Sequence, residues 1–482
     1  MAPRMRRRRV LVVVLVVLVA LIAACGVSAY TFLTRDKPVV YSNIVEQYKY
    51  GSIGTEELQG IPYELWVVLP ELFADLLPPG PGKGYERFGF LYEPGHATPI
   101  GTTYREKPIG LVGLNCALCH VGTYRDTPSS PRQMVLGMPS NNLRLWDYIQ
   151  FLRRVIRDKR FNADTLLAAI ERRFPGRLSF FDRQFWRYAV IPQTKDGLED
   201  ADQDFEWLDS RPPYGPGRVD TFNPLKQRAD FDLEADHTVG TVDFPSIWEQ
   251  RTRIGTYLHW DGNNNSLRER NLSAARAVGG TDDSMDIHQL NRIADWLLDL
   301  PPPAFPRARI NAPLARRGKT FYDQQCASCH DLGGARVGQV TPIEEIGTDR
   351  ERLDSFTPAL VTELNTNVGK GKPWRFRHFR KTDGYANLLL EGIWLRAPYL
   401  HNGSVPTLRA LLFPAERPDA FHIGYDVYDW KDAGFVSSGP AARREGWRYD
   451  TSVRGNGNEG HLYGTKLPSA QRLAIIEYLK SR

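Results

Sequence analysis

The chain has 482 residues, of which 42% are hydrophobic and 24% charged, a composition typical of a folded globular protein and not of a disordered chain. Its formal net charge is +6, and five of these charges belong to arginines at positions 4 and 6–9. The nearly neutral remainder argues against a nucleic-acid-binding surface.

An apolar segment follows these arginines. From Val10 to Leu33 the chain contains no Asp, Glu, Lys, Arg or His, and a helix of that length, at about 1.5 Å per residue, spans a hydrocarbon core of roughly 30 Å. The segment fits an uncleaved transmembrane anchor, a signal peptide cut after Ala29, or a lipoprotein signal with Cys25 as the lipidated residue. Each interpretation predicts an exported protein on the periplasmic or other extracytoplasmic face of a bacterial membrane, because the arginines are expected to stay in the cytoplasm.

The five cysteines are used in one pattern. Four of them lie in two Cys-x-x-Cys-His motifs, Cys116–His120 and Cys326–His330, and the fifth lies in the apolar segment. No cysteine remains for a structural disulfide within the globular part, so we expect the four thiols to serve another chemistry.

The spacing within each motif suits covalent haem. Cys116 and Cys119 can add to the two vinyl groups of one porphyrin while His120 binds its iron, and Cys326, Cys329 and His330 repeat the arrangement. A redox-active dithiol or a zinc site would need only the cysteines, and zinc shared by both pairs would require distant motifs to converge. We therefore predict two c-type haems.

Helical periodicity appears around both motifs. Asn141–Arg160 has an apolar stripe at helical spacing. Ile287–Leu300 and Ala470–Lys480 are predicted closing helices, and Leu314–Gln325 is the predicted helix before the second motif. Between Gln193 and Asn265, frequent Pro, Gly, Asp and Asn predict long ordered loops.

These elements predict a mainly α fold with two c-type cytochrome domains in tandem, long ordered loops and one N-terminal transmembrane or signal helix. The proline-rich stretch Pro301–Pro306 marks the boundary between the two halves. The expected units are residues 1–35 (anchor or signal), 36–303 (first haem domain) and 304–482 (second haem domain).

The sixth iron ligand of each haem is a separate question. All five methionines precede His330, so a bis-histidine site is expected for the second haem, with His378, His401, His422 and His461 as candidates. For the first haem nothing selects among the candidates, and an open position is an alternative; these candidates are His96, His237, His259, His288, Met134 and Met138.

Four segments extend the pattern beyond the haem motifs. They are Ala397–Leu408, Gly217–Asn223, His259–Asn263 and Asn456–Gly464. With these segments the chain resembles the di-haem cytochrome c peroxidase superfamily, and within it most closely the rubber oxygenase branch. The resemblance covers nearly all of the chain after the N-terminal segment.

The resemblance implies roles for three further residues. His461 would be the distal ligand of the second haem, Trp207 the tryptophan between the two haems, and Phe222 the phenylalanine over the open distal face of the first haem. Either aromatic side chain could equally be an ordinary core residue.

The chain also departs from the peroxidase pattern. Peroxidases of this superfamily usually have a histidine on the loop after the first haem motif, whereas residues 121–142 contain none. This difference argues against a reaction with hydrogen peroxide. Peroxidases of this superfamily bind calcium between the haems partly through a Thr-x-Pro segment, and Arg396 stands at the threonine position, so calcium is a doubtful cofactor. The chain is also shorter than the polymer-cleaving rubber oxygenases.

Two functions follow as hypotheses. In the first, the chain is an oxidoreductase whose first haem binds dioxygen or peroxide to oxidise a substrate, while the second haem relays electrons from a redox partner protein or a quinol-linked donor. In the second, it is a membrane-anchored electron carrier with two six-coordinate haems. The family resemblance favours the enzyme, although a shared fold does not establish activity.

Overall fold

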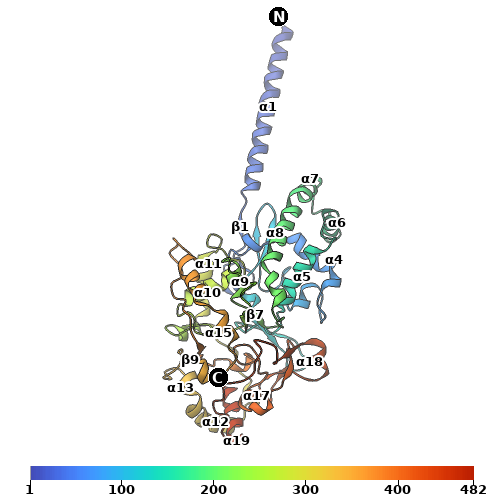
Figure 1. Cartoon of the computed structure of the whole chain (residues 1–482). Coiled ribbons are helices and arrows are strands. Elements are labelled where there is room, and N and C mark those ends of the chain that lie inside the picture. The colour runs from blue at the N-terminus through green and yellow to red at the C-terminus, as the bar shows by residue number, and fades with distance from the viewer. Residues whose placement is uncertain (1) are drawn as a thin grey trace.

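The computed structural model describes residues 2–482, apart from the side chains of residues 2–12, 25, 29, 32–33 and 58–59. Over that part of the chain, helices outweigh strands, and the strands form one four-stranded and five two-stranded antiparallel sheets. Helix α1 (Ala2–Leu33) projects away from the remaining elements (Figure 1).

The prediction of an N-terminal transmembrane helix is wrong. The segment is helical, but none of the helices among the described residues is long and apolar enough to cross a membrane. The predicted lipidation at Cys25 and cleavage after Ala29 lie outside the described side chains.

A small antiparallel sheet leads to the first haem motif. Its strands, in spatial order, are β1 (Lys37–Pro38), β3 (Thr102–Glu106), β4 (Gly110–Leu114) and β2 (Ile61–Pro62). The nearby helices are α2 (Ile44–Tyr50), α3 (Glu56–Gln59) and α4 (Tyr63–Leu72). Strand β4 ends at Leu114, and the short 3-10 helix η3 (Cys116–Leu118) begins two residues later, at the end of the sheet. The Asn115 side chain caps this helix by accepting from the Ala117 N–H at 3.0 Å.

A helical group covers one side of this half (Figure 1). It consists of α5 (Leu145–Arg157), α6 (Ala163–Arg173), α7 (Phe180–Phe185), η4 (Trp186–Val190) and α8 (Ile191–Asp204). The prediction of α5 is confirmed, but that of a loop from Gln193 is wrong, since α8 continues to Asp204. Helix α8 has no clear apolar stripe, and ion pairs from Asp202 to Arg153 (2.8 Å) and Arg157 (2.6 Å) attach it to α5.

Irregular segments do dominate from Phe205 to Asn265, as predicted. The regular elements after α8 and before the second half are η5 (Glu206–Ser210), β7 (Arg218–Asp220), α9 (Asn223–Gln227), β8 (Thr241–Asp243), η6 (Gln250–Arg253), α10 (Leu267–Ala277) and α11 (Ile287–Leu297). The hairpin β5 (Val121–Tyr124) and β6 (Gln133–Leu136) follows the first motif directly.

The second half is built around two crossing helices. Helix α12 (Ala312–Gln325) leads into the second motif on α13 (Ala327–His330), and α19 (Ser469–Leu479) packs across α12, as predicted. The other helices are α14 (Ile343–Ile346), α15 (Glu351–Ser355), α16 (Pro358–Asn367), α17 (Leu408–Leu412) and α18 (Gly439–Glu445). The strands are β9 (Val340–Pro342), β10 (Gly384–Ala386), β11 (Ala420–Ile423), β12 (Tyr428–Asp429), β13 (Gly434–Phe435) and β14 (Trp447–Asp450).

Contacts cross the proline-rich boundary between the halves. The buried carboxylate of Asp426 accepts from Thr123 Oγ1 (2.8 Å), Arg125 Nε (2.6 Å) and Arg132 Nε (2.6 Å). This cluster joins the hairpin after the first motif to the C-terminal half. The domain boundaries themselves stay a prediction.

The crossing of α12 and α19 depends on a missing side chain. A Cβ at Gly318 would lie 1.8 Å from the Ala474 carbonyl oxygen. We expect Gly318→Ala to lower the free energy of unfolding by about 2 kcal/mol, because the backbones would have to separate. A Cβ at Gly197 in α8 would have no neighbouring atom within 4 Å, so Gly197→Ala is the matched control and should be neutral or stabilising by up to about 1 kcal/mol. Urea unfolding followed by circular dichroism compares the two, and equal effects would contradict this account.

Candidate functional site

The two motifs form the same backbone turn. The N–H of His120 donates to the Cys116 carbonyl at 3.1 Å, and that of His330 donates to the Cys326 carbonyl at 3.1 Å. Each turn therefore places two thiols and one imidazole within a single short helical segment. The hydroxyl of Tyr48, from α2, donates to the His120 carbonyl at 2.7 Å and anchors the first turn.

A backbone carbonyl orients each imidazole. His120 Nδ1 lies 3.0 Å from the Pro245 carbonyl oxygen, and His330 Nδ1 lies 2.6 Å from that of Leu388. Because a carbonyl can only accept, Nδ1 carries the proton and Nε2 keeps its lone pair for a metal. This is the arrangement that a proximal haem ligand requires.

The thiols do not fit the two alternative chemistries. Burial raises the pKa of Cys116 to about 11 and that of Cys119 and Cys326 to about 12. A redox-active dithiol needs a lowered thiol pKa. Among the described residues, no three His, Cys, Asp or Glu side chains converge as a metal site, so the two cysteine pairs are not brought together for zinc.

His461 faces the second motif from the other side. Its ring centroid lies 6.2 Å from that of His330, with the ring planes at 43°. An iron bound by two imidazole nitrogens at about 2 Å each would separate the ring centroids by roughly 6 Å. The two rings therefore fit the axial ligands of one haem, although the ligand role of His461 stays a prediction.

The loop that carries His461 is held firmly. His461 has a left-handed backbone (φ 49°), and its N–H donates to the Ile346 carbonyl at 2.8 Å. The Asn402 side chain, from the Ala397–Leu408 segment, donates to the Gly457 carbonyl at 2.9 Å. The Ala397–Leu408 segment thus positions the loop that carries His461.

The other candidate histidines of the second half have different partners. His378 Nδ1 lies 2.6 Å from Glu269 Oε1. His401 Nε2 lies 2.9 Å from the Tyr385 hydroxyl, and the two rings stack at 4.0 Å. His422 lies on β11 and is partly exposed.

Phe222 lies in the apolar cluster that also contains Cys116 and Ala117 of the first motif. Its ring stacks on Phe356 with centroids 4.6 Å apart, and the Arg352 guanidinium lies 4.5 Å from the ring centroid. The structure thus places Phe222 in apolar surroundings shared with the first motif. Its position over a haem face stays a prediction.

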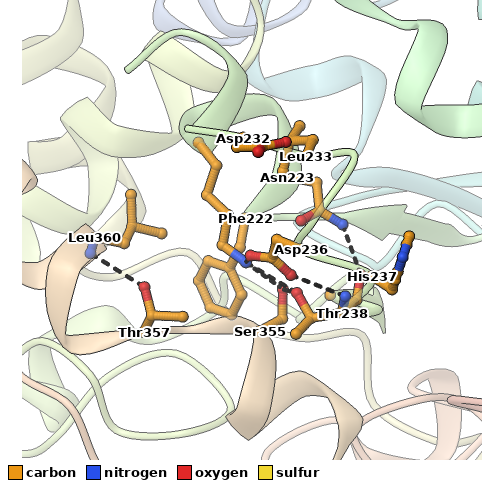
Figure 2. Close-up of polar contacts among 12 residues, drawn as sticks. Phe222, Asn223, Asp232, Leu233, Asp236, His237, Thr238, Ser355, Thr357 and Leu360 are labelled. Carbon is orange, nitrogen blue, oxygen red and sulfur yellow. Dashed lines mark hydrogen bonds and ion pairs between the residues drawn. The ribbon is translucent and has the colours of Figure 1, made fainter. Parts of the chain in front are cut away.

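The segment after Phe222 is anchored by a buried lysine. Lys226 is fully buried, and its Nζ donates to Asp236 Oδ2 (2.6 Å), Thr238 Oγ1 (2.9 Å) and Ser355 Oγ (3.4 Å). Figure 2 shows Asp236, Thr238 and Ser355 converging beside Phe222. Burial lowers the pKa of Lys226, whereas the bond to Asp236 raises it. Sequence patterns did not reveal this anchor, because a single lysine on a polar segment is usually exposed.

The candidates for the sixth ligand of the first haem differ in their surroundings. His237, His288 and Met134 are exposed. His96 stacks on Tyr50 at 4.0 Å, and Met138 is buried in an apolar cluster with residues of the second half. His259 has a left-handed backbone (φ 62°) and a buried Nε2 without a hydrogen-bond partner.

Two tryptophans, Trp207 and Trp260, differ in what they contact. Trp207 lies in a separate small cluster with Leu208, Tyr214 and Leu233, and its role between haems stays a prediction. Trp260 donates from Nε1 to the Asp243 carbonyl at 2.9 Å, and its own carbonyl accepts from the Ala386 N–H at 2.8 Å. Asp243 and Ala386 each lie two residues before a carbonyl that orients a motif histidine. Trp260 therefore connects the two segments whose carbonyls orient the motif histidines. In the sequence it was marked only as part of the segment His259–Asn263.

One part of this site matches a known protein family. Residues 384–422, which contain Leu388 and His401, match the family model described as RoxA-like, cytochrome c-like. This match implies c-type haem as a cofactor and supports the rubber oxygenase-like branch of cytochromes.

Two curated relatives are similar to the chain. The uncharacterized protein y4iM of Sinorhizobium fredii is 31% identical over 219 residues, which cover 40% of this chain and 49% of y4iM. The chain thus spans about half the length of that relative. The uncharacterized protein y4iJ of the same organism is 26% identical over 513 residues, which cover 83% of this chain and 81% of y4iJ.

The Lys226 anchor can be tested through stability. Lys226→Met should lower the free energy of unfolding by about 3 kcal/mol, because it leaves Asp236 without its buried partner. Lys195 pairs with Glu199 at 3.4 Å on the exposed face of α8, so Lys195→Met should change stability by less than about 0.5 kcal/mol. Chemical denaturation measures both, and a Lys226→Met variant as stable as this control would disprove the anchor.

Proposed function

We propose that the chain is a di-haem c-type oxidoreductase, in which the haem at Cys116–His120 binds dioxygen or peroxide and the haem at Cys326–His330 relays electrons. The observation that carries the proposal is the difference between the two motifs. At the second, His461 faces His330 with ring centroids 6.2 Å apart. At the first, the neighbouring cluster is apolar and contains Phe222.

When bound, haem iron supplies one-electron redox chemistry and, where its sixth position is free, a binding site for a small oxidant. At the first motif, His120, oriented by its bond to the Pro245 carbonyl, would hold the haem iron, and Phe222 stacked on Phe356 would keep water away from it. A phenylalanine provides no general acid, so these residues favour oxidation of an apolar substrate by dioxygen over cleavage of peroxide.

At the second motif, His330 and His461 would occupy both axial positions and keep small molecules from the iron. Such a site suits electron exchange with a redox partner protein or a quinol-linked donor. We place the protein on the extracytoplasmic side, because arginines followed by an apolar run also fit a cleaved or lipidated export signal.

A second candidate function is electron transfer without catalysis. The observation that favours it is the buried Nε2 of His259, which has no hydrogen-bond partner and could ligate the first haem. Both haems would then be six-coordinate.

Spectroscopy distinguishes the two functions. Mass spectrometry of the purified protein should show two haem additions, and a Cys116→Ser/Cys119→Ser variant should show one.

Electron paramagnetic resonance of the oxidised protein should then show one high-spin and one low-spin haem, and the reduced protein should bind one equivalent of carbon monoxide. Two low-spin haems that bind neither carbon monoxide nor dioxygen would exclude the oxygenase. His259→Ala, tested next, would identify the closing ligand.

The ligand role of His461 has its own test. His461→Ala should replace the bis-histidine signal of the second haem by a high-spin signal and raise carbon monoxide binding from one equivalent to two, because an axial position is freed. His401→Ala serves as the control, since His401 is already bonded to Tyr385 and should leave the signal unchanged. An unchanged signal in His461→Ala would show that another residue is the ligand.

A further inference from the structure

Arg253 is a buried cation without hydrogen bonds. Only 6% of the residue is exposed, and its Nε and Nη2 are buried with no hydrogen-bond partner. The nearest carboxylate oxygen, Glu391 Oε2, is 3.6 Å from Nη2 and is itself buried without a hydrogen-bond partner. A buried guanidinium with unused donors is costly, so this site calls for a further anionic acceptor.

The position of Arg253 relates it to both haem motifs. It ends η6, which follows the segment whose Pro245 carbonyl orients His120. Its partner Glu391 follows Leu388, whose carbonyl orients His330. The ion pair between Arg253 and Glu391 therefore lies where the two histidine-orienting segments meet.

A second arginine lies at the same place. Arg396, which is 9% exposed, donates from Nη1 to the Leu389 carbonyl at 2.8 Å and to the Glu391 carbonyl at 3.5 Å. Burial, together with the nearby charge of Arg253, lowers the pKa of Arg396 to about 10. Two guanidinium groups thus share Glu391 as the carboxylate beside them.

The residue type at position 396 is informative. It is an arginine, and its guanidinium is buried close to the charge of Arg253. A guanidinium can serve as a fixed cation and, unlike a metal ion, binds a carboxylate through two parallel N–H bonds.

We propose that Arg253 and Arg396 form a binding site for haem propionate carboxylates at the junction of the two haem sites. The inference rests on the proposed presence of two haems. The unused N–H groups of Arg253 donate to a carboxylate oxygen, and Glu391 holds the guanidinium in place.

The electrostatic consequence has a definite sign. A reduced haem carries one positive charge less than an oxidised haem, so a nearby cation stabilises the reduced form and a nearby anion destabilises it. Arg253→Gln should lower the midpoint potential of at least one haem, with the reduction equilibrium about tenfold less favourable, which corresponds to 59 mV for one electron. Glu391→Gln should shift the same haem in the opposite direction.

The experiment is a spectroelectrochemical titration of the full-length protein carrying its haems, with the haem number taken from mass spectrometry of each variant. Arg251→Gln is the matched control, because Arg251 lies on η6 but is exposed and paired with Asp299. This control should leave both potentials unchanged.

Two results would overturn the proposal. The first is potentials in Arg253→Gln and Glu391→Gln that stay within twofold of wild type in the reduction equilibrium. The second is a shift in the same direction in both variants, as general loosening of the fold would produce. If Arg253→Gln does not fold, the direction of the Glu391→Gln shift decides. A wild-type protein with fewer than two haems would instead disprove the proposed function, a result that the mass measurement reports separately.

Discussion

The hydrogen bond from a motif histidine to a distant backbone carbonyl organises both candidate haem sites. A Cys-x-x-Cys-His turn brings thiols and an imidazole together, but it leaves the ring free to rotate. The carbonyls of Pro245 and Leu388 remove that freedom by accepting from Nδ1. Both carbonyls follow two residues after a strand of a two-stranded antiparallel sheet, β8 in the first half and β10 in the second. In both halves, the ring of the motif histidine is thus fixed by a carbonyl that follows a short strand.

Two buried cations, Lys226 and Arg253, differ in their hydrogen bonds. Lys226 is fully buried, and its three N–H groups have three acceptors, so the chain by itself satisfies this cation. Arg253 is nearly as buried, and its guanidinium donates no hydrogen bond to any described residue. Since buried polar groups are normally hydrogen-bonded, the first arrangement is structural, whereas the second is the basis of the proposed carboxylate site. The contrast separates the anchor beside Phe222 from the candidate carboxylate site.

Helices with an apolar face were predictable, and those without one were not. Leu145–Arg157 buries apolar side chains at helical spacing, and the prediction extended it by three or four residues at each end. Ser469–Leu479 was predicted to within one residue at each end. Helix α8 is held by charge pairs between Asp202 and arginines of α5, which no periodicity reveals. The N-terminal segment shows the opposite error, because an apolar run predicted a membrane span, whereas none of the helices among the described residues is long and apolar enough to cross a membrane.

The sequence by itself determined the local chemistry of this protein. Cys116, Cys119 and His120 lie within five consecutive residues, and the second motif repeats this spacing. Because the motif is local, it can be recognised from the sequence without knowledge of the fold. Tertiary structure alone decided which carbonyls orient the two motif histidines, and where, among the described residues, a buried guanidinium lacks a hydrogen bond. The two orienting bonds join residues 58 positions apart, in His330 with Leu388, and 125 positions apart, in His120 with Pro245. Only the packing of the whole chain brings such groups within hydrogen-bonding distance.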